Sequence, residues 1–185
     1  MDHTDHVALL RGGVPTEPGT WADLGAGTGA FTLALADLLG PGAVIYAVDW
    51  DRVALRRLER ERHARFPATT LHVIEADFSQ PLPLPPLDGI VLANSLHFVR
   101  DKEPVLGLVR GYLRPGGRLL LVEYDTDRGN PWVPYPLAYP TWAALAARCG
   151  FSGTRLLATR PSRFLGRIYA AASERAAGVA SGRIG

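Results

Sequence analysis

A glycine-rich segment at residues 23–30, with the sequence DLGAGTGA, constrains the fold of this chain more than any other feature. It lies between a short apolar run, typical of a buried strand, and apolar residues with helical spacing. We expect Gly25 to permit the tight turn, Gly27 to let a ligand lie against bare backbone, and Gly29 to let the helix pack close to the strand. A strand, a glycine turn and a helix in this order predict a nucleotide-type binding site at the edge of an α/β sheet.

The spacing of these glycines and the carboxylate before them narrow the choice of ligand. The glycines follow a G-x-G-x-G spacing, which differs by one residue from the G-x-G-x-x-G of dinucleotide enzymes. Asp23, two residues before the first glycine, would repel a pyrophosphate and attract an ammonium or sulfonium group. We therefore interpret the segment as a site for a cationic ligand. The alternative is that Asp23 only caps the turn.

Short apolar runs and amphipathic stretches alternate along the chain, as in a parallel sheet covered by helices. The expected strands are residues 21–24, 43–48, 70–74, 89–93, 118–123, 154–159 and 164–172. The expected helices are residues 6–11, 30–39, 51–63 with Asp51 as N-cap, 103–113 and 141–149. The prolines between residues 81 and 86 predict an extended connector, and Pro115-Gly116-Gly117 predicts a turn.

The composition is that of an ordinary globular protein, with 47% hydrophobic and 21% charged residues among 185. This length predicts a single domain over residues 1–185, with a core at about 14–173, a short N-terminal helix and a frayed tail from about Ala176. No apolar run is long enough to cross a membrane, no signal peptide is evident, and the single cysteine cannot form an internal disulfide. We expect a cytoplasmic protein without a membrane partner, and leave its oligomeric state open.

Six arginines lie between residues 52 and 65, with two glutamates among them, although the net charge of the chain is only +2. Mixed charge of this kind is typical of a solvated helix face. A nucleic-acid surface would need aromatic or groove-reading residues nearby, and none is evident. We therefore expect no nucleic-acid partner.

Two further carboxylates each follow an expected strand. Asp49 lies twenty residues past Gly29, where a carboxylate can accept hydrogen bonds from both ribose hydroxyls. Trp50 beside it is either a cover for an adenine ring or a core residue. Asp77 can accept a bond from the exocyclic amine of adenine while the Phe78 backbone N–H faces a ring nitrogen, although an aspartate there is also a common turn residue.

These residues, in this order, resemble the class I (Rossmann-like) S-adenosylmethionine-dependent methyltransferases. The resemblance runs through successive blocks: ADLGAGTGAF, VIYAVDWD, VIEADF, LDGIVLANSLHFV and LRPGGRLLLVEYD. The closing stretch from WAALAARCGF onward is similar to the last helix and two antiparallel strands of the family, so the likeness covers about residues 21–173. It implies a Rossmann-like three-layer α/β sandwich with a seven-stranded, mostly parallel sheet of order 3-2-1-4-5-7-6, in which strand 7 is antiparallel.

The resemblance also implies S-adenosylmethionine as cofactor and S-adenosylhomocysteine as product. The glycine loop would take the methionine half, with Asp23 near its amino group. Asp49 would take the ribose, and Asp77 and Phe78 the adenine. Asn94 would line the pocket near the transferable methyl. The implied cofactor-binding residues are, in chain order, Asp23, Gly25, Ala26, Gly27, Gly29, Asp49, Trp50, Asp77, Phe78 and Asn94.

The methyl acceptor is expected to be a small molecule. The sequence NSLH after the fourth strand replaces the (Asn/Asp)-Pro-Pro-(Tyr/Phe) of branches that methylate amino groups of nucleobases or glutamine, and the connector at 130–140 is short. His97 is the candidate general base, with a packing role as the alternative. Further candidate acceptor contacts are His6, Glu123, Tyr124, Trp132, Tyr135 and Tyr139. The last three form an aromatic wall suited to a planar or apolar acceptor, or they only pack their proline-rich loop.

Two other classes of protein are also compatible with this glycine loop. A nicotinamide-dependent oxidoreductase is disfavoured because the only lysine, Lys102, belongs to no Tyr-x-x-x-Lys pair. A non-catalytic subunit that binds S-adenosylmethionine would have the same cofactor residues, so no sequence feature excludes it. The five histidines and the cysteine show no paired spacing, and we therefore expect catalysis without a metal.

Overall fold

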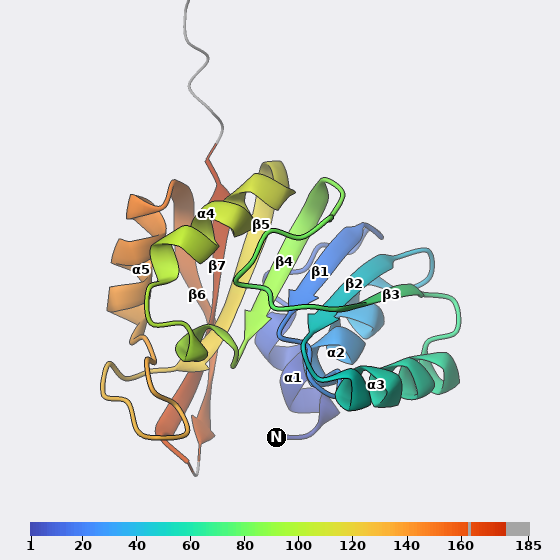
Figure 1. Cartoon of the computed structure of the whole chain (residues 1–185), viewed down its shortest axis with the longest axis horizontal. Helices are drawn as coiled ribbons and strands as arrows, with labels where there is room; N and C mark the ends of the chain where they lie inside the picture. Colours follow the sequence, from blue (N-terminus) through green and yellow to red (C-terminus); the bar gives the residue numbers. More distant parts are fainter. Residues whose placement is uncertain (163, 177–185) are drawn as a thin grey trace, which may run out of the picture.

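The computed structural model describes residues 1–162 and 164–176 (Figure 1). Most of the predicted frayed tail lies outside these described residues. The strands are β1 (Thr20–Leu24), β2 (Val44–Asp49), β3 (Thr70–Glu75), β4 (Leu87–Ala93), β5 (Leu113–Tyr124), β6 (Phe151–Ser162) and β7 (Gly166–Arg175). The helices are α1 (His3–Leu10), α2 (Ala30–Leu39), α3 (Arg52–Arg65), α4 (Lys102–Tyr112) and α5 (Tyr139–Arg148), with the short 3-10 helix η1 (Leu96–Phe98).

The strands form one seven-stranded sheet of order β3-β2-β1-β4-β5-β7-β6. The first five strands pair in parallel, and β7 pairs antiparallel with both β5 and β6. This confirms the predicted sheet order and the antiparallel strand 7. Because the order reverses between β1 and β4, the loops after these strands diverge and leave room for a ligand at the carboxyl edge.

Helices cover both faces of the sheet, and alternate residues of β5 show the two layers. Leu119 and Leu121 belong to a buried cluster that includes side chains of α4 and α5. Leu120 and Val122 belong to a second cluster with α1 and α2 (Figure 1). The apolar run of β5 is continuous because both of its faces are buried, as is typical of parallel sheets between helices. No helix within residues 1–162 and 164–176 is long and apolar enough to span a bilayer.

Two expectations about local structure were wrong. The predicted turn at Pro115-Gly116-Gly117 lies inside β5, as a bulge: between the pairs Leu87–Leu113 and Gly89–Arg118, the β5 side carries extra residues. The first helix begins at His3 and not at residue 6. Asp2 caps it with a reciprocal capping box, since the Asp2 side chain accepts from the Asp5 backbone N–H and the reverse bond is also present.

Gly29 is needed for a reason other than the one predicted. Its φ is +90°, and a Cβ there would lie 2.2 Å from Cδ1 of Leu58, which belongs to α3. The close neighbour is therefore another helix and not the preceding strand. A side chain at this position would both strain the backbone and push α3 away from the glycine loop.

We predict that Gly29→Ala lowers the free energy of unfolding by about 1–3 kcal/mol or more, through strain at positive φ and the clash with Leu58. Urea unfolding measures the loss. Gly107→Ala is the matched control, because Gly107 lies in α4 with open space where its Cβ would be. That variant should gain about 0.5–1 kcal/mol from helix propensity. Equal effects of the two substitutions would contradict the packing argument.

Candidate functional site

A cavity of about 850 Å³ lies at the carboxyl ends of the parallel strands. It is formed by the loops that follow β1, β2, β3 and β4, which is the usual ligand position in open α/β sheets. The residues that line it are Gly25, Gly27, Asp49, Trp50, Ala76, Asp77, Phe78, Ser79, Asn94, Ser95, Phe98 and Val99. The structure therefore brings together most of the predicted cofactor residues around one cavity. Asp23, Ala26 and Gly29 are not among the lining residues.

The two glycines that line the cavity differ in what surrounds them. A Cβ on Gly25, whose φ is +84°, would lie 2.3 Å from Cβ of Ser95. The β1 loop thus packs directly against the β4 loop, and the Ser95 hydroxyl donates to the Leu24 carbonyl at 2.7 Å. Gly27 has a φ of +52° and no atom within 4 Å of the Cβ position. Its backbone is therefore open to the cavity, as the sequence analysis expected.

Asp49 joins the ends of β1 and β2. One carboxylate oxygen accepts a hydrogen bond from the Gly27 N–H at 2.7 Å, and the other accepts from the Asp51 N–H at 2.8 Å. The side chain is buried, yet a carboxylate has about four acceptor positions, so both oxygens retain capacity for ligand hydroxyls. Asp51 caps α3 through bonds from Val53 and Ala54, as predicted.

The residues expected at the adenine lie on the outer part of the cavity. Trp50 is 81% exposed, so the alternative that it is a core residue is wrong. Asp77 is exposed and accepts from the Ser79 N–H at 2.8 Å, which is the turn role that was weighed against ligand binding. Its carboxylate nevertheless lines the cavity beside half-buried Phe78. Both roles are compatible in one side chain because an Asp turn uses one of its two oxygens.

Asp23 lies below the glycine loop, fully buried, and accepts a 2.6 Å hydrogen bond from the Thr32 hydroxyl. Burial raises the pKa of its carboxyl to about 7, and the charge of Asp49 adds to the shift while the Thr32 bond opposes it. The carboxyl is therefore poised to lose a proton when a cation comes near. Its position outside the lining residues makes this an electrostatic interaction and not a direct contact.

Asn94 has a strained backbone next to the cavity. Among the described residues it is the one non-glycine with a positive φ, +52°. Its side-chain Oδ1 is buried and has no hydrogen-bond partner in the described part of the chain. A buried acceptor without a partner costs about 1–3 kcal/mol, so a ligand that donates to this oxygen would gain free energy. Strain and an unsatisfied acceptor in one cavity-lining residue indicate a binding role.

His97 and Glu123 form a buried pair just behind the cavity. Nδ1 of His97 lies 2.9 and 3.0 Å from the two carboxylate oxygens of Glu123, and both side chains are almost fully buried. Glu123 also accepts from the Tyr124 N–H at 2.7 Å. A carboxylate at Nδ1 holds the proton on that nitrogen and leaves Nε2 as the acceptor. His97 does not line the cavity itself. Its ring centroid lies 4.3 Å from that of Phe98, which does line the cavity.

Lys102 also belongs to this region, although no sequence pattern predicts its burial here. Its ammonium donates to the Val99 carbonyl at 2.7 Å and lies 5.7 Å from the centre of the Tyr135 ring. The Tyr135 N–H in turn donates to the His97 carbonyl at 3.0 Å. Burial lowers the pKa of Lys102, partly offset by the Glu123 carboxylate. These bonds fix the segment that carries His97 and Phe98.

Two predicted acceptor residues lie elsewhere. His6 packs edge-to-face on Phe31 at 4.8 Å and lines a separate hollow formed with α3. Tyr139 begins α5, where its ring packs edge-to-face on buried Tyr169 at 5.7 Å. Trp132 remains exposed on the surface near the end of β5, and Tyr135 is 40% exposed.

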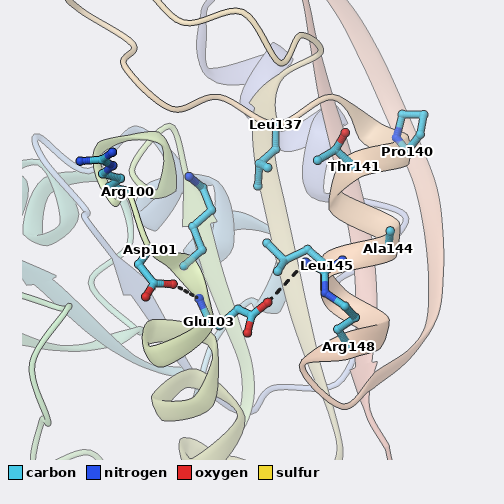
Figure 2. Close-up of a pocket in the computed structure, with 10 residues that line it drawn as sticks. Arg100, Asp101, Glu103, Leu137, Pro140, Thr141, Ala144, Leu145 and Arg148 are labelled. Carbon is cyan, nitrogen blue, oxygen red and sulfur yellow. Dashed lines mark hydrogen bonds and ion pairs between the residues drawn. The ribbon is translucent and has the colours of Figure 1, made fainter.

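A second pocket of about 590 Å³ lies between the start of α4 and α5 (Figure 2). Two of its charged groups form an ion pair, Glu103 and Arg148 at 3.4 Å, and Asp101 caps α4 through the Glu103 N–H. On the other side Leu137 and Leu145 form an apolar wall. The pocket shares no lining residue with the larger cavity. Within the described residues, no group of three or more His, Cys, Asp or Glu side chains is arranged to hold a metal.

The sheet order, the antiparallel β7 and the glycine-lined cavity define a Rossmann-like methyltransferase fold of class I. The methyltransferase domain family matches residues 22–119, which is more than half of the chain. The chain therefore belongs to the methyltransferase domain family, within the class I S-adenosylmethionine-dependent methyltransferases.

Individual relatives cover much of this chain but less of their own length. The cypemycin N-terminal methyltransferase of Streptomyces sp is 29% identical over an alignment of 161 residues, and the match covers 82% of this chain and 63% of that protein. The reducing polyketide synthase grgA of Penicillium sp is 27% identical over an alignment of 161 residues, and that match covers 75% of this chain and 6% of that protein. The chain thus spans less than two thirds of these relatives.

Solved structures share the fold. A 1,6-didemethyltoxoflavin-N1-methyltransferase from Burkholderia thailandensis, solved with its namesake compound and S-adenosylhomocysteine bound, superposes with a TM-score of 0.74. The two sequences are 18% identical, and the match covers 95% of this chain and 78% of that one. At this identity the likeness establishes the fold alone.

The raised pKa of Asp23 yields a prediction about stability. Between about pH 4 and pH 7 the folded protein holds the Asp23 proton that the unfolded chain has released, so the free energy of unfolding falls as pH rises. Asp23→Asn keeps an oxygen for Thr32 and removes this loss. The variant should gain stability relative to the parent from pH 4 to pH 7 in urea unfolding. Asp77→Asn, at an exposed carboxylate, is the control. Parallel pH curves for parent and Asp23→Asn would refute the assignment.

Proposed function

We propose that this chain transfers the methyl group of S-adenosylmethionine to a small-molecule acceptor by in-line displacement. The observation that carries the proposal is the open backbone of Gly27 beside the buried Asp49 carboxylate in one cavity of suitable size. Membership of the methyltransferase domain family supports the same reading. We further propose that residues 14–173 act as one methyltransferase domain.

The lining residues fit each part of the cofactor. Bare backbone at Gly25 and Gly27 suits the methionine half, and the nearby Asp23 carboxyl favours its cationic groups. Asp49 suits the ribose diol, because both of its oxygens are held at hydrogen-bonding distance from backbone donors and keep free lone pairs. Trp50, exposed at the cavity, suits one face of the adenine.

In the reaction the protein itself aligns the acceptor with the methyl group and excludes water. S-Adenosylmethionine, when bound, supplies a methyl group on a sulfonium that is already a good leaving group. The protein must therefore hold the acceptor atom in line with the sulfur–carbon bond. The unsatisfied Oδ1 of Asn94 is positioned to orient a donor group in this part of the cavity.

His97 is proposed as the general base for an acceptor that is protonated at working pH. Glu123 holds the proton on Nδ1, so Nε2 presents its lone pair. Burial of both groups excludes water from the pair, and Glu123 stabilises the imidazolium once it forms. The Lys102 bond to the Val99 carbonyl keeps this segment fixed during the transfer.

Cofactor selectivity is the first test of the proposal. We predict that calorimetry detects micromolar binding of S-adenosylmethionine and S-adenosylhomocysteine and no comparable binding of NAD, since the carboxylate of Asp23 repels a pyrophosphate. Asp49→Ala should weaken S-adenosylhomocysteine binding by about 1.5–3 kcal/mol, the loss of charge-assisted hydrogen bonds.

Asp51→Ala is the matched control, because Asp51 caps α3 and does not line the cavity. It should lose about 1 kcal/mol of stability with little change in affinity. Tight NAD binding would overturn the proposed function. An unchanged affinity in Asp49→Ala would remove Asp49 from the site.

The role of His97 is tested with His97→Asn, whose amide can still donate to Glu123 but cannot accept the acceptor's proton. A screen of small phenols, amines and thiols for S-adenosylhomocysteine formation first identifies an acceptor. We then predict that His97→Asn lowers turnover by about 10²–10⁴ while cofactor affinity stays nearly constant. Normal turnover would assign His97 a packing role. A screen that fails for every acceptor would favour a cofactor-binding subunit without activity.

A further inference from the structure

Large aromatic side chains are exposed together next to the cofactor cavity. Phe98 is 62% exposed, Trp132 71% and Phe164 50%. They come from three separate segments: η1, the loop between β5 and α5, and the turn between β6 and β7. Single exposed apolar side chains are common, but several that gather from distant parts of a chain often mark a binding site.

The rings form a chain of neighbours around the end of β5, in which buried His97 links Phe98 to the others. The His97 ring lies 4.3 Å from Phe98 and 6.0 Å from Tyr124. Tyr124 lies 5.9 Å from Phe164, and Phe164 lies 6.4 Å from Trp132 in an edge-to-face arrangement. We call Phe98, Tyr124, Trp132 and Phe164 the aromatic surface. His97 is the buried ring behind it.

These rings are not needed to pack the proline-rich loop. Val133 and Leu137 supply its buried contacts, with exposures of 3% and 8%. Asn130 closes its turn by accepting from the Trp132 and Val133 backbone N–H groups at 2.9 Å. The indole of Trp132 therefore stays outside although the loop is anchored. This favours binding over the packing alternative.

The carboxylates after β5 already have partners in the chain. The Asp125 carboxylate accepts from Arg167 Nε and from the Tyr139 N–H, each at 2.9 Å. The Asp127 carboxylate accepts from the Thr141 hydroxyl and the Ala138 N–H, also at 2.9 Å. Arg167 neutralises Asp125, whereas the donors to Asp127 are neutral and leave its negative charge in place, so a cationic probe has to be compared with an apolar one on these rings.

We propose that the aromatic surface binds the methyl acceptor and that this acceptor is a planar, mostly apolar molecule with one reactive polar group. The inference rests on the proposed function and specifies its substrate class. Phe98 belongs to both the aromatic surface and the cofactor cavity, so a molecule stacked on Phe98 lies beside the cavity that Asn94 also lines, with the His97 ring 4.3 Å from that of Phe98. Stacking on the aromatic surface selects planarity, and the short reach past Phe98 leaves room for a single polar group.

Two tryptophans serve as separate reporters. Trp50 stands at the cofactor cavity and Trp132 on the aromatic surface, while Trp21 and Trp142 are fully buried. Their indole N–H signals in a proton–nitrogen NMR spectrum are assigned with Trp50→Phe and Trp132→Phe. The probes are 2-naphthol, its saturated non-planar counterpart 2-decalol, choline as a cation, and S-adenosylhomocysteine.

We expect 2-naphthol to shift the Trp132 signal saturably and to leave Trp50 unchanged, and S-adenosylhomocysteine to do the reverse. Phe164→Ala should weaken 2-naphthol binding about fivefold through lost ring contact. Val53→Ala, at an exposed apolar residue of α3, should leave it unchanged.

Binding of 2-decalol or choline as tight as that of 2-naphthol would overturn the proposed acceptor class. A Trp132 signal that moves with protein concentration alone would overturn it too, because the aromatic surface would then join copies of the chain. A shift of Trp50 with S-adenosylhomocysteine but none of Trp132 with 2-naphthol overturns this inference and leaves the proposed function standing. If 2-naphthol shifts the Trp132 signal but S-adenosylhomocysteine does not shift that of Trp50, the result contradicts the proposed function only.

Discussion

The hydrogen bond from the Gly27 N–H to the Asp49 carboxylate ties together the two strands on which the whole site depends. It crosses from the loop after β1 to the end of β2, and it sets the open backbone of Gly27 against a buried negative charge. Gly25 and Gly29, on either side, allow the close approach of Ser95 and Leu58, so the β4 loop and α3 take their positions from the same turn. Three glycines with positive φ in one loop thus determine the positions of the end of β2, the loop after β4 and helix α3.

Much of the fold could be predicted because most of the parallel strands are short apolar runs with clear stops, although β6 is longer and more polar than predicted. Helix 30–39 and the Asp51 cap were predicted to the residue. The bulge at Pro115–Gly117 was not, because glycine and proline favour a turn locally and only pairing with β4 absorbs them into the strand. The gathering of residues around the cavity was predictable because they follow strands in register, and the carboxyl ends of parallel strands meet at one edge.

The surroundings of His97 were less predictable, because their contacts join residues far apart in the sequence. The His97–Glu123 pair spans 26 positions, and neither residue signals the other locally. Lys102 opens a helix between two acidic residues, a pattern typical of an exposed charge, yet tertiary packing buries it against Tyr135. Phe98 and Phe164 lie in separate segments, η1 and the β6–β7 turn, and no local pattern predicts that either ring is exposed. Glu123 and Lys102 are buried near each other. Because their charges are opposite, each lowers the desolvation cost of burying the other.

The antiparallel β7 has a consequence for how such a protein can change over evolutionary time. Because β7 runs opposite to β5, the turn before it reaches the same edge as the ends of the parallel strands. The cavity nevertheless draws on both halves of the chain, since its lining runs from Gly25 in the loop after β1 to Phe98 in η1 and Val99 just after it. The described residues of the loop after β5 and of the turn before β7 lie at the same edge without contributing a lining residue to that cavity, so their length and side chains can change while its wall stays intact.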